Sequence, residues 1–196
     1  MARLFRDLID LLSEDEAKTI AGPHLLRLRG CIEDGIRAVD QREAQDPGFF
    51  RVYSSSTRAA LVYWQIVHLA ESRFQGVAGV STSHNRGFLT ILIDDRLEIR
   101  FKKLDRTRRS RNYPTAHQTL YQQQRRLVGM EEPTRATAGY QLNPDNTVRD
   151  ILVVCPRGHR LEWSFSIPMD TSTLHQHPQT VAPASDEKPV VRPKKA

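Results

Sequence analysis

The fold is indicated by residues 88–102, which read FLTILIDDRLEIRFK, two apolar runs on either side of the polar turn Asp94-Asp95-Arg96. Side chains of a strand point alternately to its two faces, so Leu97, Ile99 and Phe101 predict one buried face. The opposite face is mainly positive and carries Glu98, Arg100 and Lys102. The stretch therefore predicts an antiparallel hairpin with one side in the core.

Upstream of this hairpin, residues 1–75 carry apolar residues at helical spacing. Ser13-Glu14-Asp15-Glu16 has the Ser-x-x-Glu form of a capping box, which predicts a short helix ending near Gly22-Pro23. The spacing of Leu4, Leu8, Leu11 and Leu12 predicts a separate helix before it. A further apolar stripe runs from residue 24 to about residue 44, and Ser54-Ser55-Ser56-Thr57 supplies N-cap candidates for another helix. We expect these helices to pack on one face of a sheet.

The helix that begins near Ser54 has apolar residues nearly all round its middle, which is typical of a central core helix. Trp64 is therefore predicted to be buried, and His68 is interpreted as a core histidine rather than a ligand. After this helix the period changes, and residues 79–87, rich in Ser, Thr, His and Asn, are expected to form a loop.

Downstream of the hairpin, a basic segment reaches residue 113, a helix is predicted over 114–127, and residues 137–168 are rich in β-strand patterns. The strand candidates there are 138–142, 148–154 and 161–167. The whole order predicts an α+β fold, with N-terminal helices packed on a four- or five-stranded, mainly antiparallel sheet. Residues 171–196 lack large aromatic residues and hold four of the 11 prolines, so we expect a disordered tail.

The length of 196 residues suits one domain, predicted over residues 1–170. No apolar stretch approaches the length of a membrane-spanning helix, and the first residues lack the apolar core of a secretory signal, so we expect a cytoplasmic protein without membrane contact. Cys31 and Cys155 show no disulfide or zinc spacing and are interpreted as buried reduced thiols.

The charge is concentrated in one segment. The net charge is +6, and residues 98–128 alone carry nine basic side chains against Glu98 and Asp105. Basic side chains interleaved with hydroxyls and an amide are the groups that bind phosphate oxygens, which favours nucleic acid or another polyanion as partner. The candidate binding residues are Arg100, Lys102, Lys103, Arg106, Arg108, Arg109, Arg111, Tyr113, Arg125 and Arg126. The leading hypothesis is a non-enzymatic binding module, and it needs no cofactor.

A nuclease is the first alternative. Asp94, Asp95 and Glu98 lie at the hairpin, Lys102 follows on the same strand face, and Glu33 lies on an upstream helix. Carboxylates beside a lysine resemble the magnesium site of restriction-enzyme-like nucleases, although that family carries a Glu-x-Lys triplet and this chain has Arg100 at its third position. Magnesium is expected only under this alternative.

Two further alternatives use other residues. His84 and His117, with nearby arginines, have the side chains of a metal-independent ribonuclease, in which histidine acts as base and arginine holds the phosphate. The same basic surface also suits an interaction subunit that docks an acidic protein partner. Phosphate-loop, dinucleotide-binding and serine-hydrolase motifs are missing from the sequence.

Overall fold

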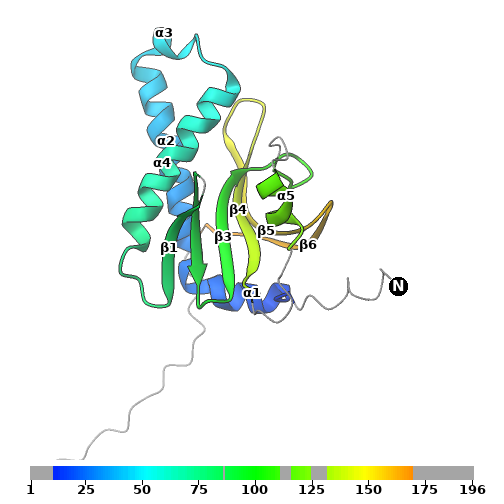
Figure 1. Cartoon of the computed structure of the whole chain (residues 1–196). Helices are drawn as coiled ribbons and strands as arrows, with labels where there is room; N and C mark the ends of the chain where they lie inside the picture. Colours follow the sequence, from blue (N-terminus) through cyan, green and yellow to red (C-terminus); the bar gives the residue numbers. More distant parts are fainter. Residues whose placement is uncertain (1–10, 86, 111–115, 125–131, 170–196) are drawn as a thin grey trace, which may run out of the picture.

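The computed structural model describes residues 11–85, 87–110, 116–124 and 132–169, and it confirms the α+β class (Figure 1). Six strands form the sheet, rather than the four or five expected. The helices are α1 (Glu14–Ala21), the 3-10 helix η1 (Gly22–His24), α2 (Leu25–Gln45), α3 (Pro47–Phe50), α4 (Ser55–Phe74) and α5 (Ala116–Gln122). The strands are β1 (Val80–Asn85), β2 (Phe88–Ile93), β3 (Leu97–Lys103), β4 (Thr134–Leu142), β5 (Val148–Arg157) and β6 (Arg160–Ser166). The predicted tail, 171–196, lies outside the described residues.

The strands lie in the sheet in chain order, from β1 to β6. All neighbours are antiparallel except β3 and β4, which run parallel in a register that pairs Ile99 with Ala136 and Phe101 with Ala138. Parallel strands need a connection that crosses over a face of the sheet, and here that connection contains α5. The predicted helix over 114–127 is confirmed for Ala116–Gln122, whereas Gln123 and Gln124 form a turn.

The expected loop over residues 79–87 is wrong, because Val80–Asn85 forms β1 and pairs antiparallel with β2. Its sequence, VSTSHN, has one large apolar residue and no buried face that periodicity could detect. Hydrogen bonding to the strongly apolar β2 makes it a strand, which is a tertiary effect that local sequence does not carry.

Two layers cover the sheet. In Figure 1, α2 and α4 run side by side as a helical pair with α3 at its tip, whereas α5 lies over another part of the sheet. Leu97, Ile99 and Phe101 are fully buried in the core shared with the helical pair, as the alternation of the strand predicts. Gly35 allows the pair to approach closely, since a Cβ there would lie 2.6 Å from Ile66 Cγ1.

The helix α4 is not buried on all sides, and this corrects two predictions. Its buried stripe is narrow and consists of Val62, Ile66, Val67, Ala70 and Phe74. Trp64 is 53% exposed, and His68 is exposed as well. The helix packs on α2 and the sheet along one side only, so apolar residues on its outer side have no layer to cover them.

Caps and turns follow the sequence signals closely. Ser13 and Glu16 form the predicted capping box, and the Ser54 side chain accepts a hydrogen bond from Thr57 N at the start of α4. Asp94 and Asp95 adopt positive φ angles of 49° and 53° in the tight turn between β2 and β3. Aspartate tolerates this left-handed backbone better than most residues, so the turn suits its sequence. Cys31 and Cys155 are both buried and free, as expected.

Candidate functional site

The polar face of β3 is the starting point for the site, and it is more deeply covered than the sequence predicts. Arg100 is 5% exposed and Lys102 is 8% exposed, although both were expected on a solvated basic face. The aromatic ring of Tyr121 from α5 lies 3.9 Å from the Arg100 guanidinium carbon, and the ring of Phe88 lies 4.2 Å from Lys102 Nζ. Neighbouring aromatic side chains therefore bury two of the proposed contact residues.

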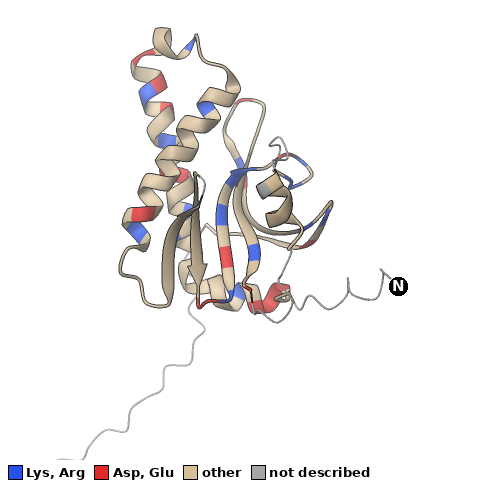
Figure 2. Ribbon diagram, in the orientation of Figure 1, with Lys and Arg blue, Asp and Glu red and all other residues tan. Residues whose placement is uncertain are grey.

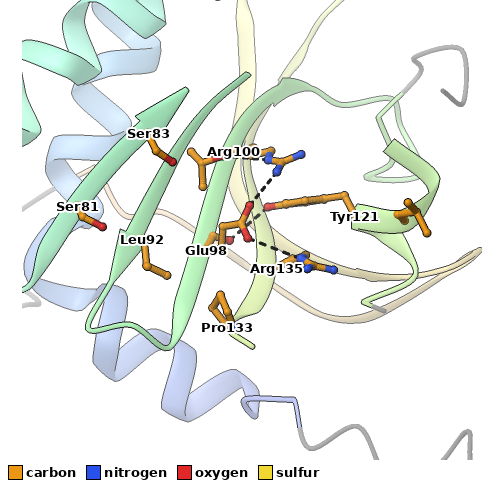
Figure 3. A pocket seen from close by; sticks show the side chains of 10 residues that line it. Ser81, Ser83, Leu92, Glu98, Arg100, Tyr121, Pro133 and Arg135 are labelled. Atoms are coloured by element: carbon orange, nitrogen blue, oxygen red, sulfur yellow. Dashed lines mark hydrogen bonds and ion pairs between the residues drawn. The ribbon is translucent and has the colours of Figure 1, made fainter. Parts of the chain in front are cut away.

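Arg100 is held in an ion-pair network (Figure 3). Its Nη2 donates to Glu98 Oε1 at 2.9 Å, and its Nε donates to Thr90 Oγ1 at 3.2 Å. The second carboxylate oxygen of Glu98 lies 3.6 Å from Arg135 Nε on β4. Arg100 Nη1 is buried without an acceptor among the described residues. Most of the Arg100 guanidinium is thus used inside the protein.

These residues border a cavity of about 420 Å³ that opens beside α5. Ser81 and Ser83 of β1, Leu92 of β2 and Pro133 form its other walls (Figure 3). Arg135 is also paired with Glu132 at 2.6 Å, so the two arginines of this region are balanced by two carboxylates. The cavity is polar but carries no excess positive charge.

Lys102 has a different environment two residues further along β3. Within the described part of the chain, no carboxylate or other hydrogen-bond acceptor pairs with its amine. Burial, reinforced by the positive charge of Arg100, lowers the pKa of Lys102 to about 8. By contrast, Lys18 on α1 is exposed and pairs with Glu14 at 2.6 Å, which raises its pKa. Lys102 is therefore a desolvated cation whose nearest groups are aromatic rings.

Lys102 faces a cavity of about 780 Å³ at the end of β3, which we call the basic cleft. Its walls come from the N-terminal part of α4, the end of β3, residues 104–107 and the turn between β4 and β5. Its charged lining residues are Lys102, Lys103, Arg106, Arg149 and Asp105. The Asp105 carboxylate accepts hydrogen bonds from Thr107 N at 2.8 Å and Arg109 N at 3.1 Å, so it also serves to hold its own loop.

The cleft has an excess of positive charge, and its cations come from separate elements. Lys103, Arg106 and Arg149 are exposed, and Figure 2 shows Lys and Arg gathered toward the end of β3 and in the following segment. Ser55 and Ser56 place the N-terminus of α4 in the same wall, where the helix dipole adds partial positive charge. The arrangement attracts anions.

Comparisons with protein-family models, curated proteins and solved structures find no match to this chain. None of the helices in the described ranges has the length and apolarity to cross a bilayer.

The remaining basic candidates lie on the other side of the loop. Arg108 and Arg109 are exposed beside a smaller cavity of about 220 Å³, which Arg160 and His159 also border. Arg108 Nη1 donates to Ser164 Oγ at 2.7 Å. The candidates that lie outside the described residues are Arg111, Tyr113, Arg125 and Arg126, and the same holds for the side chain of His117.

The acidic hairpin does not assemble the predicted magnesium site. Glu98 is paired with arginines, and Asp94 and Asp95 are exposed in the turn. Lys102 lies four residues beyond Glu98 on β3, which corresponds to about 13 Å along the strand. Glu33, also expected to contribute, pairs with Arg29 on its own helix at 2.8 Å. Among the described residues, no three His, Cys, Asp or Glu side chains come close enough to hold a metal ion.

His84 lies on the face of β1 that meets the helical pair, where its Nε2 is 2.6 Å from Glu71 Oε1 of α4. The structure thus places it away from the basic cleft, which it does not line. Sequence reasoning also missed Arg149, Tyr63 and Phe88 as parts of the cleft. No local signal identifies them, because Phe88 reaches the end of β3 through the pairing of β2 with β3, Tyr63 through the packing of α4 on β3, and Arg149 through the pairing of β5 with β4.

Proposed function

We propose that the protein binds nucleic acid through the basic cleft. The observation that carries this proposal is the convergence of Lys102, Lys103, Arg106 and Arg149 from two strands and a loop on one cavity of about 780 Å³. A phosphate backbone carries regularly spaced negative charges, and cations that replace its condensed counterions gain affinity without reading sequence.

The geometry supports a polymer more than a single small anion. Arg108 and Arg109 lie across the loop from the cleft and extend the positive surface beyond it. The loop itself is held by hydrogen bonds of the Asp105 carboxylate to Thr107 N and Arg109 N, so its cations are displayed on an ordered backbone. A chain of phosphates can contact both sides of such a loop.

The test is the salt dependence of binding to single-stranded DNA, duplex DNA and RNA. The four cations of the cleft predict a slope of log K against log salt of about −3 for a single strand, and contacts of Arg108 and Arg109 steepen it to about −4. The double variant Arg106→Ser/Arg149→Ser should make the slope shallower by about 1.5 and weaken binding at low salt. Arg96→Ser is the matched control, since Arg96 is exposed in the turn at the opposite end of β3 and its side chain pairs with Glu16 at 3.5 Å.

A second variant examines the far side of the loop. Arg108→Glu/Arg109→Glu should weaken binding strongly and leave the thermal midpoint nearly unchanged, since exposed loop charges contribute little to folding.

Binding that does not respond to salt, or that falls equally in Arg96→Ser, contradicts the proposal. Tighter binding of polyglutamate than of any nucleic acid would assign the surface to an acidic protein partner. Magnesium is included in each assay, so that any cleavage is seen.

A further inference from the structure

Lys102 has features that phosphate binding alone does not need. A lysine can neutralise phosphate from an exposed position, such as that of Lys103 at the mouth of the cleft. Lys102 is instead 8% exposed, with Nζ 4.2 Å from the Phe88 ring centroid and 5.9 Å from the Tyr63 ring centroid. Its amine is held in an aromatic wall, next to a cavity large enough for a ligand.

The surroundings of Lys102 favour its neutral form. Arg100 lies two residues away on the same strand face and is paired with Glu98, whereas no carboxylate among the described residues pairs with Lys102. The pKa of about 8 leaves about a tenth of the amine unprotonated at pH 7, whereas an ordinary lysine has almost none. Desolvation and a neighbouring cation are the two conditions that make a lysine amine a nucleophile toward carbonyl compounds.

We propose that Lys102 forms an imine with the aldehyde of a phosphate-bearing ligand in the basic cleft. This inference rests on the proposed function, because the same cleft must hold the phosphate. Lys103, Arg106 and Arg149 hold the phosphate group at the mouth, and the aldehyde reaches the amine at the aromatic wall. The Tyr63 hydroxyl is used in the fold, since it accepts from Leu89 N at 3.2 Å and donates to Gly87 O.

The reaction is balanced without an oxidant or a reductant. The lone pair of neutral Nζ adds to the carbonyl carbon, and the carbonyl oxygen takes up a proton from water to give a carbinolamine. The nitrogen gives one proton to water as the carbinolamine forms. The hydroxyl then takes up a proton and leaves as one water molecule while the nitrogen lone pair forms the C=N bond, and the nitrogen releases its second proton to water. The product is a C=N bond between Lys102 and the ligand, and water reverses the step.

Two sources present this chemistry: a free phosphorylated aldehyde, or the abasic sugar of a nucleic-acid strand, whose aldehyde is flanked by phosphates. The experiment therefore has two arms. The full-length protein is incubated with pyridoxal 5′-phosphate, or with a single-stranded oligonucleotide that contains one abasic site. Sodium cyanoborohydride converts any imine to a stable secondary amine, and peptide mass spectrometry then locates the adduct.

We expect the adduct at Lys102 to exceed that at the exposed Lys18 by at least tenfold, and to exceed the adduct formed with pyridoxal, which lacks the phosphate. Reaction in only the oligonucleotide arm identifies the abasic strand as the source, and reaction in only the other arm identifies the free aldehyde. Lys102→Arg keeps the charge but cannot form an imine, so trapping should be lost. Lys18→Arg is the control that should leave it unchanged. The peptide map of the wild-type protein gives the answer even if Lys102→Arg does not fold.

The imine proposal is overturned if the amount of adduct at each lysine simply increases with the exposure of that lysine, or if trapping persists in Lys102→Arg. Salt-dependent binding of an intact oligonucleotide by the wild type, with no adduct at Lys102, overturns the imine alone. If the wild-type protein neither binds the oligonucleotide nor forms an adduct at Lys102, the proposed function is overturned as well. Equal trapping of pyridoxal and its phosphate shows that the cleft does not hold the phosphate of the ligand, which overturns the imine proposal, whereas nucleic-acid binding is judged by its own salt dependence.

Discussion

Replacing Lys102 with Met tests whether this cation is desolvated in the folded protein. The pKa of Lys102 falls from 10.5 to about 8 on folding, and a shift of this size corresponds to about 3 kcal/mol of destabilisation. The contact of Nζ with the Phe88 ring at 4.2 Å favours the charged amine by roughly 1 kcal/mol. Because methionine has a similar length and no charge, we expect Lys102→Met to be about 2 kcal/mol more stable at pH 7.

The pH dependence gives the sharper measurement. A lowered lysine pKa means that the unfolded chain binds more protons between pH 8 and 10.5, so the wild type gains stability over this range. The destabilisation of the folded protein by the charged Lys102 amine is fully present below pH 8. It disappears toward pH 10.5, as Lys102 of the unfolded chain also loses its proton. Urea unfolding of the wild type and Lys102→Met from pH 7 to 10.5 should therefore show the difference in their free energies of unfolding shrink toward zero. The other titrating groups are the same in both proteins, so their contributions cancel in this difference. A difference that does not change with pH, or a less stable variant at pH 7, refutes the reasoning.

Other substitutions examine the network, the helical layer and the loop. Glu98→Gln removes the charge that pairs with Arg100 at 2.9 Å, so urea unfolding should show a loss of roughly 2 kcal/mol. Its nucleic-acid affinity should stay level or rise slightly, and magnesium-dependent cutting that disappears in this variant would instead assign catalysis to the hairpin. Trp64→Ala should cost less than about 1 kcal/mol in thermal unfolding because the side chain is half exposed, whereas a loss of 3 to 5 kcal/mol, roughly that of a buried tryptophan, would restore the sequence expectation. Gly139→Ala should cost roughly 1 to 3 kcal/mol, since its Cβ would lie 2.5 Å from Leu104 Cγ, and an unchanged urea midpoint would show that the loop moves freely.

The sequence predicted the elements whose signals are local and strong. Alternation in residues 97–102 fixed the two faces of β3, and the Ser13 and Ser54 caps marked two helix starts correctly. These features depend on side-chain spacing and on hydrogen bonds within a few residues, so they survive without tertiary context. The edge strand β1 was missed because its pairing with β2, and not its own composition, makes it a strand.

Charge counting found the basic segment, but it did not separate exposed cations from buried ones. Arg100 and Lys102 alternate with core residues, so the sequence places them correctly on the second face of β3. It does not reveal that Tyr121, on the helix that connects β3 to β4, covers Arg100. Nor does it reveal that the rings of Phe88 and Tyr63 lie beside the Lys102 amine. Burial of a charged group depends on the chain segments that fold over it, and these are distant in sequence.

The sequence by itself determined the α+β class, the faces of the hairpin and the location of the excess positive charge. The tertiary structure decided which cations converge, since Arg149 reaches the cleft through the pairing of β5 with β4. It also decided that Glu98 forms ion pairs with Arg100 and Arg135 and does not join the hairpin aspartates in a metal site. Local periodicity reports which way a side chain points, whereas the partner that it meets is set by packing between elements far apart in the chain.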